Sequence, residues 1–197
     1  MMILPVTYKV VSCDMNTLFK YYKKDTIRGY CKTCPNYNKI WSCPQYDFEE
    51  ESYLREYNYA YIIGAKLYLK DIEKELERMN FKSNTEILTF AYNSIRNIVD
   101  KKSLSIEKNI NNSRILMGGK CLICKTCQRT KSKPCLHPES LRYSLESLGF
   151  EVSSITKEIL KEDLLFSKDQ LPKYCLSISS LLTNDKISKE EIFKFLV

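Results

Sequence analysis

Seven of the nine cysteines form two clusters whose spacing is typical of metal ligands. The late cluster consists of Cys121, Cys124 and Cys127, and Cys135 follows after seven further residues. A C-x2-C-x2-C run with another Cys beside a proline is how chains wrap a 4Fe–4S cluster, although bacterial ferredoxins place only three residues before the last Cys. Three thiolates from one short loop suit neighbouring corners of a cubane, whereas zinc is usually bound by separated pairs. The late cluster therefore predicts an iron–sulfur ligand set of four thiols.

The early cluster has three thiols, Cys31, Cys34 and Cys43. Either a distant Cys completes this set, or one metal position is open to water or a ligand, as in reactive sites. In two-cluster ferredoxins the last Cys of each run serves the other cluster, so Cys135 is a candidate ligand for either set. The spacing leaves open whether there are one or two clusters and which set includes Cys135. Trp41 is expected in an apolar shell around the metal or simply in the core.

The remaining candidates have simpler interpretations. Cys13 and Cys175 lie in expected strands, where a free Cys is most often a small buried apolar side chain. His137 is the only histidine, and we expect it to precede a helix that starts at Pro138. The alternative is a zinc site of the Cys3His type that includes His137.

The charge of the chain favours a redox role over nucleic-acid binding. The formal net charge is +7, and seven thiolates on two cubanes of core charge about +2 each would lower it to roughly +4. The basic stretch at 128–133 is expected to stabilise an anionic cluster. A phosphate-contacting loop is the competing interpretation, but no aromatic residues that stack on bases are interleaved with these cations.

Length and composition predict a single α+β domain over residues 1–197. Hydrophobic residues make up 44% of the chain, which is enough for a core that does not depend on disulfides. No segment is long and apolar enough to span a membrane, and the run from Met1 to Lys9 lacks the features of a signal peptide. We therefore expect a cytoplasmic protein whose thiols are reduced.

The periodicity predicts a small mixed sheet packed by helices, with two cysteine-rich metal-binding loops at 31–43 and 121–135. The expected helices follow Asp14, occupy a helical segment at about 71–110 with a candidate break at 100–103, and then run over 138–149, 155–163 and 188–197. The expected strands are 6–11, an apolar stretch within 53–69, 114–117, 150–153 and 173–182. Gly149 stands where a helix cap needs positive φ.

These cysteine motifs resemble an uncharacterised bacterial and archaeal family of predicted cysteine-rich metal-binding proteins, a domain of unknown function. The family's early C-x2-C and W-x-C-P elements look like Cys31, Cys34 and 41–44, and its late elements look like 121–127, 134–138 and 144–149. The sequence departs from the family at Tyr143, where Pro is frequent, and at 150–151, where Ile-Asp is usual. The resemblance covers most of the chain and implies metal binding, but it supplies no reaction.

The leading hypothesis is a protein that binds one or two 4Fe–4S clusters and handles electrons for a partner redox protein or enzyme. The alternative is a zinc-stabilised module that contacts nucleic acid or an acidic protein. The sequence has no nucleotide-binding glycine loop, no radical-initiating C-x3-C-x2-C and no catalytic triad. Enzymatic activity and oligomeric state therefore stay open.

Overall fold

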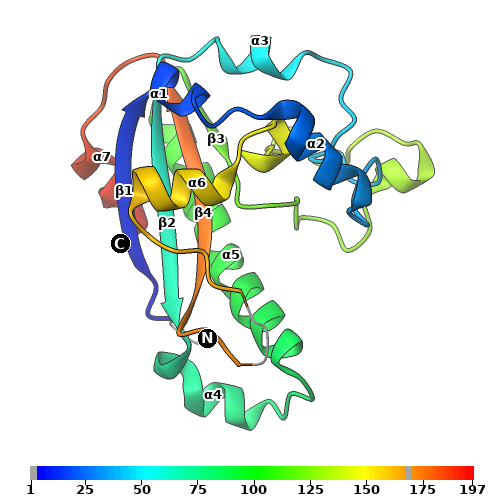
Figure 1. The fold of residues 1–197 in the computed structure, drawn as a ribbon, viewed down its shortest axis with the longest axis vertical. Coiled ribbons are helices and arrows are strands. Elements are labelled where there is room, and N and C mark those ends of the chain that lie inside the picture. Colours follow the sequence, from blue (N-terminus) through cyan, green and yellow to red (C-terminus); the bar gives the residue numbers. More distant parts are fainter. Residues whose placement is uncertain (1–3, 167–169) are drawn as a thin grey trace.

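The computed structural model describes residues 4–166 and 170–197, and an antiparallel sheet with the strand order β1-β2-β4-β3 lies at its centre (Figure 1). Residues 1–3 of the run from Met1 to Lys9, for which no signal-peptide features were expected, lie outside the described residues. The strands are β1 (Thr7–Asp14), β2 (Tyr59–Tyr68), β3 (Ser113–Leu116) and β4 (Tyr174–Thr183). The two central strands, β2 and β4, pair along their full length and are buried on both faces, as their apolar sequences require.

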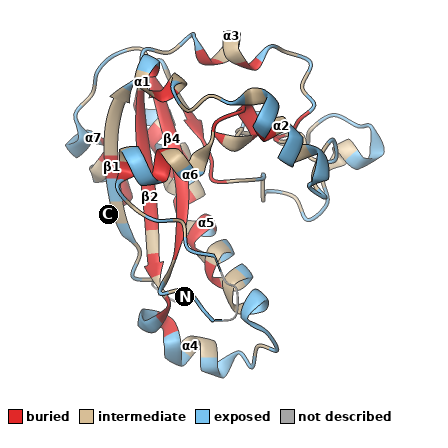
Figure 2. Ribbon diagram, viewed as in Figure 1, coloured by how far each residue is buried: buried red, intermediate tan, exposed pale blue. Residues whose placement is uncertain are grey.

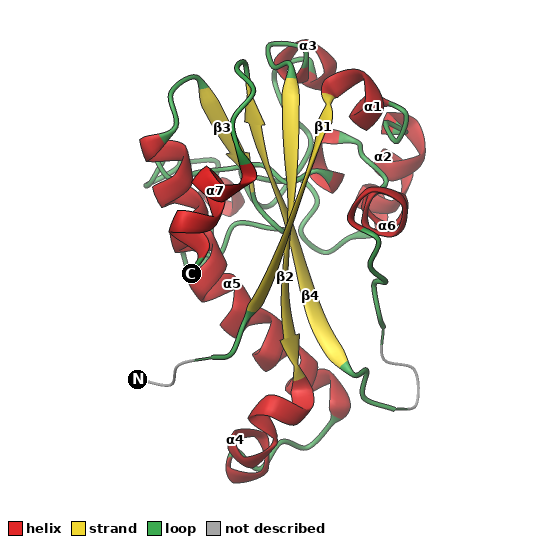
Figure 3. Cartoon of the chain, turned by 90° about the vertical axis from the view of Figure 1, so that its left-hand side faces the viewer, coloured by secondary structure: helices red, strands yellow, loops and turns green. Residues whose placement is uncertain are grey.

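Helices cover both faces of the sheet (Figure 3). Shorter turns connect several of them. The helices are α1 (Met15–Phe19), α2 (Lys24–Thr33), α3 (Glu50–Leu54), α4 (Glu73–Arg78), α5 (Asn84–Asn109), α6 (Val152–Ile155) and α7 (Lys189–Leu196). The shorter turns are the 3-10 helices η1 (Leu69–Ile72), η2 (Gln128–Lys131) and η3 (Glu146–Leu148), and the π-helical turn η4 (Thr156–Leu160).

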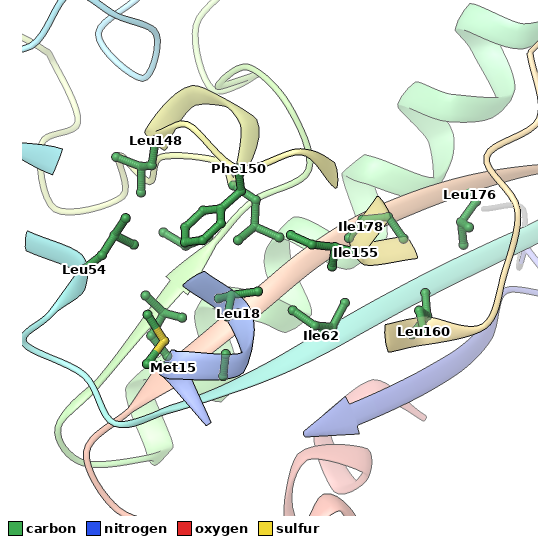
Figure 4. Packing of buried hydrophobic residues seen from close by; sticks show 14 residues of the cluster. Met15, Leu18, Leu54, Ile62, Leu148, Phe150, Ile155, Leu160, Leu176 and Ile178 are labelled. Carbon is green, nitrogen blue, oxygen red and sulfur yellow. The ribbon is translucent and has the colours of Figure 1, made fainter. Parts of the chain in front are cut away.

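The alternation of side chains along the strands sorts the core into two layers. On one face, Ile62 and Ile178 pack with Leu18 of α1, Ile155 of α6 and Phe150 (Figure 4). The other face is covered by α5 and α7, where separate clusters form around Ile63 and Leu67. Cys175 is buried in the second of these clusters, and Cys13 packs against the first layer. Both residues therefore have the apolar surroundings expected from the sequence.

The cysteine-bearing segments lie together beside the sheet, on the same side as α2 (Figure 1). We call residues 28–46 and 117–138 the cysteine lobe. Intermediate and exposed residues predominate in this lobe, in contrast to the buried strands (Figure 2). The sheet thus acts as the rigid base from which the lobe projects.

The α+β class is confirmed, but the sheet is not mixed, because every strand pair in it is antiparallel. A lone parallel bridge between Met117 and Ser144 lies outside the named strands. The apolar stretch that begins at Tyr53 contains a helix end before β2 starts. Glu50, the first residue of α3, explains why a helix forms here. Its carboxylate is buried and pairs with Lys24 and Arg28, which stabilises α3.

The prediction of a helix over 138–149 is wrong. Only η3 forms near its end, because the Tyr143 carbonyl accepts a hydrogen bond from the Met117 N–H at 2.7 Å. The hydroxyls of Ser144 and Ser147 also accept bonds from each other's backbone N–H groups, which competes with helical pairing. Gly149 nevertheless adopts φ 105°, as a cap there requires.

Two further predictions need correction. The strand expected at 150–153 is reduced to a single bridge between Phe150 and Tyr22, and α6 begins at Val152. Helix α5 runs unbroken through 100–103. Asp100 is held within the helix, since Arg96 donates to both of its carboxylate oxygens at 2.8 and 2.7 Å, and Lys102 donates to the Leu196 carbonyl of α7 at 2.7 Å.

The close approach of Gly118 to β4 gives a test of this fold. A Cβ on Gly118 would lie 2.6 Å from the Ser177 hydroxyl and 2.8 Å from the Ile178 carbonyl oxygen, whereas a Cβ on Gly29 would meet nothing within 4 Å. We expect Gly118→Ala to lower the free energy of unfolding by about 1–3 kcal/mol. Gly29→Ala, in helix α2, should raise it by about 0.5–1 kcal/mol. Urea denaturation of the reduced protein measures both, and equal effects would contradict the observed approach of Gly118 to β4.

Candidate metal centre

The four late thiols, Cys121, Cys124, Cys127 and Cys135, line one small cavity. His137 and four apolar residues complete its wall: Ile40, Trp41, Ile123 and Leu141. The cavity has a volume of about 20 Å³, so a group larger than one ion enters only if the loop moves outward. Burial raises the pKa of Cys121, and the neighbouring late thiols raise it further. The structure thus brings together the four thiols that the spacing singled out.

Arg96 and Tyr92 of α5 set the start of the late loop. Arg96 is 1% exposed, and besides binding Asp100 it donates to the carbonyl oxygen of Lys120 at 3.1 Å. Tyr92 donates to the Gly118 carbonyl at 3.4 Å. Gly119 has φ 79°, a conformation that strongly favours glycine. The chain therefore leaves the sheet in a fixed direction one residue before Cys121.

The early thiols are placed by the end of α2 and the loop that follows it. Cys31 lies in the last turn of α2, Cys34 caps that helix, and the Cys43 N–H donates to the Ile40 carbonyl at 2.9 Å. The Asn36 amide donates to the Cys34 sulfur at 3.6 Å. Burial raises the pKa of Cys43 to about 11. Burial also raises the pKa of Cys31, and the neighbouring Arg28 partly opposes that rise.

The two cysteine loops interlock through Arg129. Its guanidinium donates to the carbonyl oxygens of Ile40 at 3.1 Å and Cys43 at 2.6 Å, and also to that of Gln45. The same group lies 4.8 Å from the ring centroid of Trp41. This arrangement was not predicted from the sequence, in which Arg129 counted only as a cation near the cluster.

Two further contacts join the loops. The Trp41 indole N–H donates to the Lys133 carbonyl at 3.1 Å, and the Cys121 N–H donates to the Ser42 hydroxyl at 2.9 Å. Ser42 is 1% exposed and directly precedes Cys43. Residues of the early loop therefore form part of the late cavity, and the early and late sites share one polar framework.

The structure groups Cys135 with the late thiols, on the wall of their cavity, and not with Cys31 and Cys43. Over residues 4–166 and 170–197, no three Cys, His, Asp or Glu side chains stand close enough to hold a single metal ion as they are. His137 shares the cavity wall, and its Nδ1 lies 3.9 Å from Glu139. That these thiols bind a metal stays a prediction.

Glu146 was not predicted as a site residue. It opens η3, and its carboxyl lies beside Gly119 and influences the pKa values of Cys31 and Cys43. The only signal in the sequence is a carboxylate between Leu145 and Leu148, two residues of the expected apolar stripe. Such a charge inside an apolar pattern marks a group with a specific partner.

Comparison with protein families gives a match over residues 20–177 to a family described as predicted metal-binding protein (DUF2284). The chain belongs to this family. The match includes both cysteine clusters and Glu146, and it confirms the resemblance drawn from the cysteine motifs. Searches of the curated proteins and of the solved structures gave no match. Metal binding is the property that the family description states, and it leaves the metal unspecified.

None of the described helices has the length and apolar character needed to cross a membrane.

The interlock predicts a specific effect of replacing Arg129. Arg129→Lys keeps the charge but cannot donate to three carbonyl groups in a fixed fork, so carbonyls of the early loop lose their partners. We expect the free energy of unfolding of the reduced, metal-free protein to fall by about 1–3 kcal/mol. Lys131→Ala, at an exposed position of the same turn, is the control and should change it by less than about 0.5 kcal/mol. Equal effects in urea denaturation would show that the interlock is dispensable.

Proposed function

We propose that this protein binds a 4Fe–4S cluster through Cys121, Cys124, Cys127 and Cys135 and acts in one-electron transfer with a redox partner. The observation that carries the proposal is that these four thiols, drawn from one loop, line a single cavity. Four thiolates are the usual protein ligands of a cubane. The early thiols, Cys31, Cys34 and Cys43, are proposed as a second metal site.

The donor chemistry at the late site fits such a cluster. The backbone N–H of His137 donates to the Cys135 sulfur at 3.4 Å. Hydrogen bonds of this kind to cluster sulfurs raise the reduction potential. Trp41 and Ile123 shield the thiols from water, which lowers the local dielectric constant. When bound, the cluster would supply reversible one-electron chemistry. The chain's own residues orient the thiols and limit solvent access.

The charge distribution supports an anionic centre in the cysteine lobe. The lobe contains eight Lys and Arg residues and no Asp or Glu, while the rest of the chain has 23 basic and 24 acidic residues. The whole positive excess of the protein therefore lies in the lobe. Seven thiolates on two cubanes would reduce the lobe's charge to roughly +5, so a positive surface remains around the site.

This remaining charge supports an acidic redox protein as the partner. Three large apolar side chains next to cysteines are exposed: Tyr30 by 69%, Ile123 by 45% and Leu136 by 61%. Exposed apolar groups within a field of one sign are typical of transient interfaces in which charge steers the encounter. The partner is thus expected to present carboxylates around its own redox centre.

A zinc-stabilised binding module is the second candidate, and the position of His137 favours it. His137 lies on the wall of the late cavity and offers a nitrogen donor for a Cys3His set. In that case the basic lobe would contact nucleic acid or an acidic protein, with no redox role.

Anaerobic purification followed by iron, zinc and acid-labile sulfide analysis distinguishes the two candidates. We expect a brown protein with broad absorbance near ~400 nm and sulfide equal to iron. Cys124→Ser should remove most of the iron of the late site, whereas Cys175→Ser, within the core, should retain it. Colourless protein with stoichiometric zinc and no sulfide would refute the proposal, and equal iron loss in the two variants would refute the ligand assignment.

The charge of the lobe predicts how salt affects electron exchange. Oxidation of the reduced protein by anionic ferricyanide should slow as ionic strength rises, and oxidation by cationic hexaammineruthenium should accelerate. The double variant Lys131→Glu, Lys133→Glu should weaken both dependences. Lys186→Glu, on the loop before α7, is the control outside the lobe. Stopped-flow oxidation rates that do not change with ionic strength would contradict electron exchange through the lobe. The same conclusion would follow if the lobe variant and the Lys186→Glu control changed the salt dependence equally.

A further inference from the structure

The segment between two of the early cysteines covers the late cavity. We call residues 35–42, which lie between Cys34 and Cys43, the strap. Two side chains of the strap, Ile40 and Trp41, form part of the wall of the cavity that the four late thiols line. The outward side of the strap is exposed at three positions: Pro35, Asn38 and Lys39. The strap therefore has one side on the late site and the other in water.

Hydrogen bonds within the early loop hold the strap together as a unit. The Asn38 N–H donates to the Pro44 carbonyl at 2.7 Å, and the Lys39 N–H donates to the Asn36 carbonyl at 3.1 Å. Residues 34–49 contain no helix or strand that would tie the strap to a neighbouring element. A surface loop that is closed by its own hydrogen bonds can move away from its neighbours without unfolding.

A small number of hydrogen bonds hold the strap against the late loop. The Trp41 indole N–H donates to the Lys133 carbonyl at 3.1 Å, and the Ser42 hydroxyl accepts from the Cys121 N–H at 2.9 Å. Arg129 supplies the remaining bonds described above. Each of these bonds contributes only modestly to a closed position. The strap is therefore expected to open more readily than the paired strands of the sheet.

The early thiols lie at both ends of the strap. Cys34 directly precedes it and Cys43 directly follows it, while Cys31 lies one helical turn earlier in α2. A metal bound by these three thiols would join the two ends of the strap to each other and to the end of α2. Such a crosslink restricts a loop because it removes conformational freedom from the chain between the ligands. The early site is thus placed where it can hold the strap closed.

We propose that the strap is a lid over the late site and that metal binding by the early thiols locks this lid. The inference rests on the proposed function, in which both sets bind metal. The cavity behind the strap, about 20 Å³, is too small for a 4Fe–4S cluster, so the strap has to move outward while the site is loaded. With the early site filled, Ile40 and Trp41 are held over the late thiols. The early site then controls how long the late site keeps its metal.

The test measures how fast each late thiol becomes accessible. Full-length protein, metal-free or reconstituted anaerobically with iron and sulfide, is mixed with a chelator and pulsed with iodoacetamide, and peptide mass spectrometry quantifies each cysteine separately. In the loaded protein, Cys34→Ser should still bind metal at the late site. Its late thiols should react about tenfold faster than in the native chain, because the closed strap has lost its lock. In the metal-free protein the same variant should react at the native rate.

A second variant separates the lid from its lock. Trp41→Phe keeps the aromatic ring but loses the bond to the Lys133 carbonyl, so the late thiols should react about threefold faster with or without metal. Two variants serve as controls and should react at the native rate. These are Cys13→Ser, in β1, and Lys39→Ala, on the outward side of the strap.

Three results would overturn the inference. The first is loaded Cys34→Ser protein whose late thiols react no faster than those of Cys13→Ser, and the second is a Cys34→Ser chain that binds no metal. The third is metal-free Trp41→Phe protein that reacts at the native rate. The melting temperature of each metal-free variant detects a folding defect, and Cys43→Ser replaces Cys34→Ser if the latter unfolds. If the native chain binds no metal, the proposed function fails, and metal-free Trp41→Phe still tests the lid.

Discussion

The arrangement of the two cysteine loops depends on one guanidinium group. Arg129 comes from the late cysteine loop, yet its hydrogen bonds go to three carbonyl oxygens of the early loop and its plane lies near the Trp41 ring. These carbonyls belong to a segment with little regular structure, so they have few other partners. Arginine can serve three carbonyls at once because its five N–H groups form a rigid fork. This contact supplies most of the side-chain hydrogen bonds between the two loops, and the Trp41–Lys133 and Cys121–Ser42 contacts supply the others described above.

Electrostatics sets the second constraint. Seven cysteines gather in the cysteine lobe, which contains Lys and Arg but no Asp or Glu. The positive excess of the lobe balances the charge that the donors acquire on metal binding, because thiols bind metals as thiolates. In the metal-free protein, burial keeps the pKa of Cys43 at about 11, so that thiol is protonated at neutral pH. Under the proposed function, metal loading would release protons, and metal affinity should rise with pH.

The sheet and α5 turn this lobe into a defined site. Gly118 passes so close to β4 that a side chain would collide with Ser177 and Ile178, and Arg96 holds the next turn through the Lys120 carbonyl. Both anchors are buried, so the late loop starts from the most rigid part of the protein. Metal sites built on rigid elements hold their ligands more accurately than those supported by loops alone. The early loop has no such anchor of its own, and it is positioned by α2 and by the late loop.

The sequence by itself determined the ligand candidates, the α+β class, the central strands and most of α5, because each depends on local spacing or periodicity. The cysteine intervals and the apolar runs of β2 and β4 carry their meaning within a few residues. The tertiary structure decided that Cys135 lies with the late thiols, that Arg129 joins the two cysteine loops and that 138–149 is not helical. These outcomes depend on hydrogen bonds between segments roughly 25 to 90 residues apart, such as Arg96 to Lys120, Cys121 to Ser42 and Arg129 to Ile40. No local pattern records such contacts, since each partner has an ordinary sequence neighbourhood and acquires its role only when the chain folds.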